Sequence, residues 1–257
     1  MLFQVWEYFL YFFLKEDQHS IHSPFFFSFY ENVKDYIKEN KKGQEAIERQ
    51  RRKFLGMNDE IQVTDFGAGS RWGFGKKRKV ASIVKRSNTP IRFSLLYQFL
   101  CQQTPAITVL DLGTSLGINT AYLAAVTKGK LYTFEGDPAL ESLAKRHLGF
   151  FPSVQIVSGN IDNTLTKTLQ HKESIDNVLM DANHRYQPTI DYFRIISPKL
   201  HPNSILVIAD IHWSKEMRKA WNELKMLPRV TGSIDFFECG VLFFGNHGDN
   251  NDFVLEI

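Results

Sequence analysis

The segment from residue 109 to residue 120 (VLDLGTSLGINT) combines residue types that suit the binding of a small ligand. Asp111 lies at the end of a predicted buried strand, and Gly113, Ser115 and Gly117 follow at alternate positions. Glycine lets the backbone turn sharply and approach a ligand closely. The free N–H groups at the start of the next helix would face that ligand. The sequence therefore predicts a ligand-binding loop between a strand and a helix.

Three kinds of loop share this pattern. A dinucleotide fingerprint requires G-x-G-x-x-G, but Ser115 and Ile118 stand at the second and third glycine positions. The nucleophile elbow G-x-S-x-G of hydrolases matches residues 113–117 literally. However, only one weak strand precedes residue 107, no HGG-type loop is found, and His247 lies in a polar tail that suits a catalytic base poorly.

The third kind of loop, which binds S-adenosylmethionine (SAM), requires a second acid at the end of the next strand. Glu135 stands there, in the segment YTFEGD. The two oxygens of one carboxylate match the two hydroxyls of one ribose. Two correctly spaced features on consecutive strands favour this reading over the other two, although Glu135 could also be a solvated strand-end carboxylate.

On these motifs the chain resembles the class I methyltransferases that use SAM, and among them the O-methyltransferase-like branch that includes the catechol and caffeoyl-CoA enzymes. The resemblance covers about residues 105–245. With HSIHSPF at residues 19–25, the whole chain is also similar to a group of bacterial proteins of this class. The matching segments are LDLGTSLG (110–117), FEGDP (134–138), SGN (158–160), VLMDANH (178–184) and VIADIHW (207–213).

The resemblance implies SAM as the cofactor and a small or medium acceptor, methylated at oxygen. Residues 113–117 would line the methionine part of SAM, Glu135 would hold the ribose, and Asn160 and Ile161 would flank the adenine. Asn160 could equally be a helix cap. The implied cofactor-binding residues are Asp111, Gly113, Thr114, Ser115, Gly117, Glu135, Gly136, Asn160, Ile161 and Asp181.

The acceptor site is expected where the fourth and fifth strands end, because ligands gather at the carboxyl ends of parallel strands. Asp181 and His184 follow the fourth strand, and Asp210 and His212 follow the fifth. We predict that these four catalytic candidates converge beside the SAM methyl group, with one imidazole as a general base. The acids could instead bind polar groups of the substrate or cap helices.

A divalent metal is the alternative to a histidine base. In the catechol-type enzymes, magnesium is held by acids at these two places and by an Asn directly after the second. Asp181 and Asp210 supply the acids, but Ile211 stands where the Asn is expected. Oxygen ligands suit Mg²⁺, whereas the nearby histidines favour a softer metal.

The elements that position these residues alternate between strands and helices, which indicates an α/β fold with a mainly parallel sheet. We expect a Rossmann-like sheet of seven strands with an antiparallel last strand, in a methyltransferase domain over residues 105–257. Residues 1–104 form an N-terminal region that is mostly helical. The predicted strands are 107–112, 130–135, 154–158, 175–181, 204–210, 229–237 and 239–245. The predicted helices are 119–127, 138–148, 161–170, 186–200 and 215–225.

Residues 1–14 (MLFQVWEYFLYFFL) are strongly apolar but too short to span a bilayer, which needs about 20 residues. No Lys or Arg precedes the apolar run, so a signal peptide is not indicated. We expect a helix that packs on the domain or forms a homodimer contact. Binding to a membrane surface is the alternative.

Other features bear on partners and compartment. The net charge of +3 is too mild to demand a nucleic-acid partner. The two cysteines, far apart, indicate neither zinc nor a disulfide framework, and a cytoplasmic setting is the simplest. Three further segments are interpreted as solvated surface. They are a second glycine loop at residues 65–70, the basic run that continues it to residue 79, and the basic segment 41–53. They leave open an anionic substrate, a phospholipid surface or an RNA methyltransferase. A SAM-binding protein without turnover is a further alternative.

Overall fold

The structure is a computed structural model that describes residues 2–64, 77–86, 89–247 and 251–257. The second glycine loop, at residues 65–70, and residues 71–76 of the basic run lie outside these residues. None of the described helices is long and apolar enough to cross a membrane.

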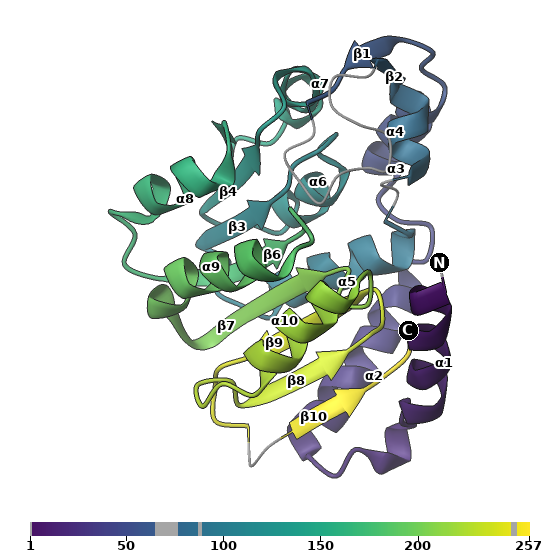
Figure 1. Cartoon of the computed structure of the whole chain (residues 1–257), viewed down its shortest axis with the longest axis vertical. Helices are drawn as coiled ribbons and strands as arrows, with labels where there is room; N and C mark the ends of the chain where they lie inside the picture. The colour runs from purple at the N-terminus through teal and green to yellow at the C-terminus, as the bar shows by residue number, and fades with distance from the viewer. Residues whose placement is uncertain (1, 65–76, 87–88, 248–250) are drawn as a thin grey trace.

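The described residues form one large sheet of eight strands in the order β10-β8-β9-β7-β6-β3-β4-β5 (Figure 1). The strands β7, β6, β3, β4 and β5 are parallel, and β9 is antiparallel to both β7 and β8. The bounds are β3 Thr108–Leu112, β4 Lys130–Glu135, β5 Val154–Ser158, β6 Ile175–Met180, β7 Leu200–Ala209, β8 Gly232–Asp235, β9 Cys239–Phe243 and β10 Asn251–Val254.

The mainly parallel sheet with an antiparallel strand confirms the predicted fold class, but the sheet has one more strand than predicted. The addition is β10, which pairs in parallel with β8. Its sequence, Asn-Asp-Phe-Val, belongs to the segment that we read as a polar tail, and only Phe253 in it is buried. A strand of four residues with one buried side chain carries too little hydrophobic pattern to be found from sequence.

Helices cover both faces of the sheet. On one face α8, α9 and α10 enclose a core that contains Leu110, Leu112 and Phe134. On the other face α2, α5 and α6 enclose a core around Val109 and Leu131. The helix bounds are α1 Leu2–Leu14, α2 Pro24–Glu39, α3 Glu45–Leu55, α4 Val80–Arg86, α5 Ile91–Gln102, α6 Ile118–Ala124, α7 Pro138–Leu148, α8 Ile161–Leu169, α9 Tyr186–Ile196 and α10 Lys215–Lys225.

The N-terminal region is mostly helical, as predicted, and its parts lie in different places. Helices α1 and α2 lie beside the C-terminal strands, whereas α3, α4 and the small hairpin of β1 (Glu60–Gln62) and β2 (Lys77–Lys79) lie near α7 (Figure 1). The backbone N–H of Thr64, after β1, donates a hydrogen bond to the carboxylate of Asp137 at the start of α7. The hairpin is therefore fixed beside the end of β4, where Glu135 lies.

Candidate functional site

A cleft of about 630 Å³ opens at the carboxyl ends of β3, β4, β6 and β7. This volume lies within the range of small-molecule sites. Its wall contains both the glycine loop and the acids predicted to face the acceptor. The strands are parallel there, so their carboxyl ends meet at one edge of the sheet and bring together residues that are far apart in the sequence.

The glycine loop has a conformation that its residue types explain. Gly113 has a φ of +116°, and a Cβ atom there would lie 2.2 Å from the carbonyl oxygen of Asp181. Gly117, with a φ of +79°, is the N-cap of α6. Thr114 and Ser115 complete the loop, and the cleft is lined by Gly113, Thr114 and Ser115. Only glycine accepts the close approach at position 113, so the loop shape depends on it.

Glu135 connects the end of β4 to the glycine loop. Its Oε2 accepts a hydrogen bond from the backbone N–H of Ser115 at 2.7 Å, and its Oε1 accepts one from the N–H of Asp137 at 2.8 Å. Burial raises the pKa of Glu135 to about 7, although these N–H donors act in the opposite direction. A carboxylate has about four lone-pair sites. Each oxygen can therefore accept one further donor from the cleft, where Gly136 also lies.

Asp111 does not reach the cleft, in contrast to the expectation that it binds the cofactor. It is 1% exposed, and its Oδ2 accepts hydrogen bonds from the hydroxyls of Thr120 at 2.6 Å and Thr133 at 2.8 Å. Its Oδ1 has no hydrogen-bond partner among the described residues. Burial raises the pKa of Asp111 to about 7. The residue lies below the loop because its side chain points from β3 towards the start of α6.

We call the part of the cleft lined by the glycine loop and Glu135 the cofactor half. Asn160 and Ile161, which follow β5 beside β4, also line the cleft. The Oδ1 of Asn160 accepts a hydrogen bond from the N–H of Asp162 at 3.0 Å, so Asn160 is also the N-cap of α8. The helix-cap reading of this residue is therefore confirmed. Capping and lining the cleft are compatible, because the cap uses only the Oδ1 atom.

Three of the four predicted acceptor-site residues converge. The Nε2 of His184 lies 3.7 Å from Oδ1 of Asp181, and its Nδ1 lies 3.5 Å from Oδ2 of Asp210. Positive φ angles at His184 (40°), Asp210 (58°) and Asn183 (63°) turn both strand ends into the cleft. Such angles are unusual for residues other than glycine and are maintained only where the surrounding structure imposes them.

The electrostatics of this cluster suit a positively charged occupant. Burial raises the pKa of both Asp181 and Asp210, while the nearby His184 opposes the rise. The three side chains offer ligand atoms that lie within 4.8 Å of one another, and Nδ1 of His184 is buried without a hydrogen-bond partner among the described residues. The donor set of two carboxylates and one imidazole therefore fits a divalent cation. Ile211 is fully buried and contributes no ligand.

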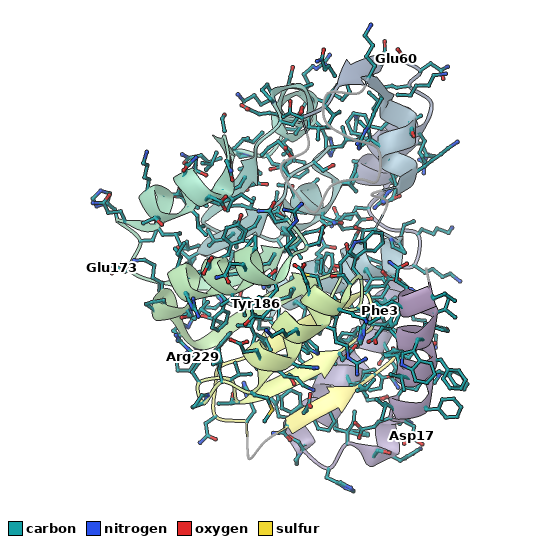
Figure 2. All side chains as sticks on the ribbon, viewed as in Figure 1. Phe3, Asp17, Glu60, Glu173, Tyr186 and Arg229 are labelled. Carbon is teal, nitrogen blue, oxygen red and sulfur yellow. The ribbon has the colours of Figure 1, made fainter. Side chains whose placement is uncertain are left out.

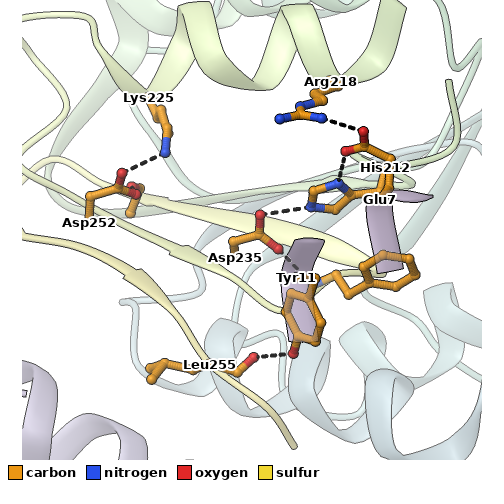
Figure 3. A network of polar contacts seen from close by, with 10 residues as sticks. Glu7, Tyr11, His212, Arg218, Lys225, Asp235, Asp252 and Leu255 are labelled. Carbon is orange, nitrogen blue, oxygen red and sulfur yellow. Dashed lines mark hydrogen bonds and ion pairs between the residues drawn. The ribbon is translucent and has the colours of Figure 1, made fainter. Parts of the chain in front are cut away.

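His212 does not join the cluster, so its predicted place in the acceptor site is wrong. Its Nδ1 lies 2.9 Å from Oε2 of Glu7 in α1, and its Nε2 lies 2.8 Å from Oδ2 of Asp235 in β8 (Figure 3). Burial acts to lower the pKa of His212, but the two carboxylates outweigh it and the net shift is upward. The turn that begins at Asp210 directs the side chain two residues later towards α1. The following residue, Trp213, is 55% exposed and lines the cleft.

Asn119 is a cleft residue that sequence reasoning missed. Its side chain acts to lower the pKa of the nearby Asp181, and its Nδ2 donates a hydrogen bond to the hydroxyl of Thr89 at 2.9 Å. Its Oδ1 accepts from the hydroxyl of Ser94 at 2.9 Å. The sequence did offer one signal for Asn119, namely its position. It lies in the first turn of α6, directly after the glycine loop, and this turn faces the end of β6. Tyr97, from α5, was missed because it lies before the segment with recognisable motifs.

Comparisons with known proteins agree with this geometry. A family model described as a methyltransferase domain matches residues 110–211. The protein-L-isoaspartate O-methyltransferase of Pyrococcus horikoshii is 28% identical over 152 residues, which are 56% of this chain and 62% of that protein. The chain therefore spans less than two thirds of the length of this relative.

Solved structures show the same fold. The SAH-bound methyltransferase of Podospora anserina has a TM-score of 0.59 at 13% identity, over 83% of this chain and 95% of that chain. An O-methyltransferase from Bacillus cereus in complex with SAH has a TM-score of 0.56 at 12% identity, over 82% and 99%. Residues 110–211 thus match a methyltransferase domain, and the described residues have the Rossmann-like fold of these methyltransferases.

Proposed function

We propose that the protein transfers a methyl group from SAM to an oxygen atom of a small-molecule acceptor. One observation carries the proposal: the cluster of Asp181, His184 and Asp210 faces the same cleft as the glycine loop and Glu135. Methyl transfer to a hydroxyl requires alignment of the two reactants and removal of one proton. The cleft offers a place for both reactants and a group that can take the proton.

The cofactor half of the cleft suits SAM, which supplies a methyl group on a positively charged sulfur when bound. Glu135 would accept hydrogen bonds from the ribose hydroxyls with the lone pairs that Ser115 and Asp137 leave open. The backbone at Gly113 leaves room for the methionine part of SAM. Asn160 and Ile161 would border the adenine. Asp111 supports the loop from below through Thr120 and Thr133.

In the acceptor half, His184 would take the proton of the acceptor hydroxyl. Asp181 and Asp210, on either side of its ring, would stabilise the imidazolium that forms. Asn119 would hold Asp181 in place. The exposed ring of Trp213 would border the acceptor. These residues bind and orient the acceptor and move one proton, which is what this chemistry asks of the protein.

A second candidate for the acceptor half is a divalent cation held by the same three side chains. The spacing of their ligand atoms and the unpartnered Nδ1 of His184 favour it. A bound cation would lower the pKa of the acceptor hydroxyl and make a histidine base unnecessary. In that case His184 binds the metal through a ring nitrogen and takes no proton.

The test is turnover of SAM to S-adenosylhomocysteine by the purified protein with pooled small metabolites, with total RNA and with denatured protein as separate acceptors. We expect product only with the metabolites and at least a hundredfold less with Asp210→Asn, whose SAM affinity is unchanged. Product with RNA or protein alone would overturn the acceptor class. SAM binding without turnover on any acceptor would overturn the enzyme assignment and leave a SAM-binding interaction protein.

A chelator then separates the two mechanisms. If EDTA abolishes turnover and one divalent ion restores it, the three side chains hold a metal. If turnover is unchanged by EDTA, His184 acts as the base. In that case His184→Ala should lose activity that added imidazole partly restores.

A further inference from the structure

Helix α1 has an inner face that is fixed to the rest of the chain. Glu7 is 1% exposed and contacts His212 and Arg218 (Figure 3). The hydroxyl of Tyr11 donates to the carbonyl oxygen of Leu255 at 2.6 Å, and Tyr8 packs edge-on against Phe237 with ring centroids 5.1 Å apart. Polar and aromatic contacts of this kind fix how α1 is rotated about its own axis, and so fix which residues face outwards.

The outer face of α1 is apolar and uncovered. Its central row, Leu2, Val5, Phe9 and Phe12, follows a spacing of three, four and three residues. These side chains are between 52% and 90% exposed. Trp6 and Phe13, on the same face and seven residues apart, are also more than half exposed. In Figure 2 aromatic side chains extend from α1 away from the rest of the molecule.

The exposed area of α1 is large for a protein that acts alone. The six side chains of the outer face, Leu2, Val5, Trp6, Phe9, Phe12 and Phe13, are all more than half exposed. A large apolar side chain that is at least half exposed offers roughly 100 Å², so the six together offer about 600 Å². The largest apolar patch of a typical monomer is about 300–600 Å². A specific protein interface buries about 800 Å² on each partner.

The pattern of the face indicates what covers it. Apolar residues spaced three and four apart form the seam along which two helices pack. A helix that lies on a membrane surface is typically rich in Lys and Arg on its polar face. Helix α1 has neither residue, and its polar side chains, Gln4 and Glu7, contact the protein instead.

We propose that the outer face of α1 binds the same face of a second copy of this chain. Two-fold symmetry makes such a contact self-complementary, because one patch then faces its own copy. The dimer would place the two α1 helices side by side at the edge of each molecule, next to β10. This inference does not depend on the proposed function, since it concerns a surface outside the cleft.

The contact also bears on the cleft. The Nε2 of Gln4 donates to the carbonyl oxygen of Trp213 at 3.3 Å, and Glu7 holds His212. Both partners belong to the segment that follows Asp210. Dimerisation through α1 would therefore support the helix that holds one wall of the acceptor half.

The mass of the protein in solution tests the proposal. Sedimentation or light scattering at micromolar concentration should give twice the chain mass of 29.8 kDa. The double variant Phe9→Glu/Phe12→Glu should have the mass of one chain and an unchanged circular dichroism spectrum. The matched control is Phe150→Glu, because Phe150 is 86% exposed and lies between α7 and β5, at the opposite edge of the sheet. This control should remain a dimer.

A cross-linking experiment tests where the two chains contact each other, and it places no charged side chain in that contact. Both native cysteines are buried, so a short bis-maleimide should join only introduced cysteines. Phe9→Cys should give a covalent dimer, and Phe150→Cys should not. A wild-type protein with the mass of one chain would overturn the proposal. So would a dimer that Phe9→Glu/Phe12→Glu leaves intact, or a single-chain protein that floats with phospholipid vesicles through α1.

Discussion

The N–H of Ser115 donates a hydrogen bond of 2.7 Å to Oε2 of Glu135, which joins the loop after β3 to the end of β4. Because β3 and β4 are neighbouring parallel strands, this bond joins the glycine loop to the end of β4 at the edge of the cleft. It also holds a buried carboxylate, whose pKa burial raises to about 7, at the surface that faces the ligand.

SAM affinity should rise with pH between about 6 and 8. Ribose hydroxyls donate to the ionised form of Glu135, which predominates only above its pKa of about 7 in the free protein. Binding therefore releases a proton at lower pH and weakens there. Glu135→Gln should bind SAM at least tenfold more weakly at pH 8, since a charged hydrogen bond contributes about 1.5–3 kcal/mol. Calorimetric titration at pH 6, 7 and 8 measures both effects, and equal wild-type affinity across this range would contradict the assignment.

Asn119 should act as a positioning residue for Asp181. Its amide favours the ionised form of that carboxylate, so Asn119→Ala should raise the pKa of Asp181 further and move the acidic limb of the pH–turnover profile to higher pH. We expect turnover at pH 7 to fall by up to about tenfold, because a smaller fraction of Asp181 is then ionised. SAM affinity should not change. The matched control is Asn163→Ala, at an exposed position of α8. An equal loss of turnover at all pH values would argue against this role.

The sequence predicted the part of the site whose geometry follows from strand order. Glu135 and Asp181 end parallel strands, and parallel strands present their ends to one edge, so their position in the cleft could be predicted. The strands β4 and β5 and the helices α7 and α10 have the predicted bounds. Hydrophobic alternation and helix caps such as Asp137 depend only on residues close together in the sequence, so they could be predicted.

The orientation of the other predicted site residues depends on contacts between residues that are far apart in the sequence. Both His184 and His212 follow strands that end at the cleft, but His212 contacts Glu7 of α1 instead, more than 200 residues away in the sequence. Asp111 ends a strand as expected, but hydroxyls of Thr120 and Thr133 hold it below the loop. Sequence spacing places a residue on a strand end. It does not determine in which direction the side chain points when a buried residue elsewhere in the chain can bind it.

Asp111 should make the folded protein less stable as the pH rises. Its pKa in the folded protein is about 7, above the ordinary value of 3.8, so the folded state binds more protons than the unfolded state between these values. The contribution of Asp111 to the free energy of unfolding therefore falls between pH 4 and 7, by up to about 1.4 kcal/mol per pH unit. Asp111→Asn removes this slope. Urea unfolding of both proteins from pH 5 to pH 8 should show that the unfolding free energy of the variant rises relative to that of the wild type as the pH rises. A difference in unfolding free energy that stays constant with pH would contradict a pKa of about 7 for Asp111.

Glu7 should couple the docking of α1 to the acceptor half of the cleft. It is buried and contacts two basic side chains, His212 and Arg218, so Glu7→Ala leaves both without this carboxylate. Breaking a buried ion pair costs about 3–5 kcal/mol. Because α1 is a surface helix that can detach locally, we expect this loss mainly as faster hydrogen exchange of its backbone amides. Turnover should fall as well, because the segment after Asp210 that loses its contact with Glu7 includes Trp213, which lines the cleft. SAM affinity should not change, because Glu135 is remote from α1. Glu39→Gln, at an exposed position of α2, is the control. If Glu7→Ala speeds exchange in α1 but leaves turnover at the wild-type rate, then α1 is a structural element without influence on the site.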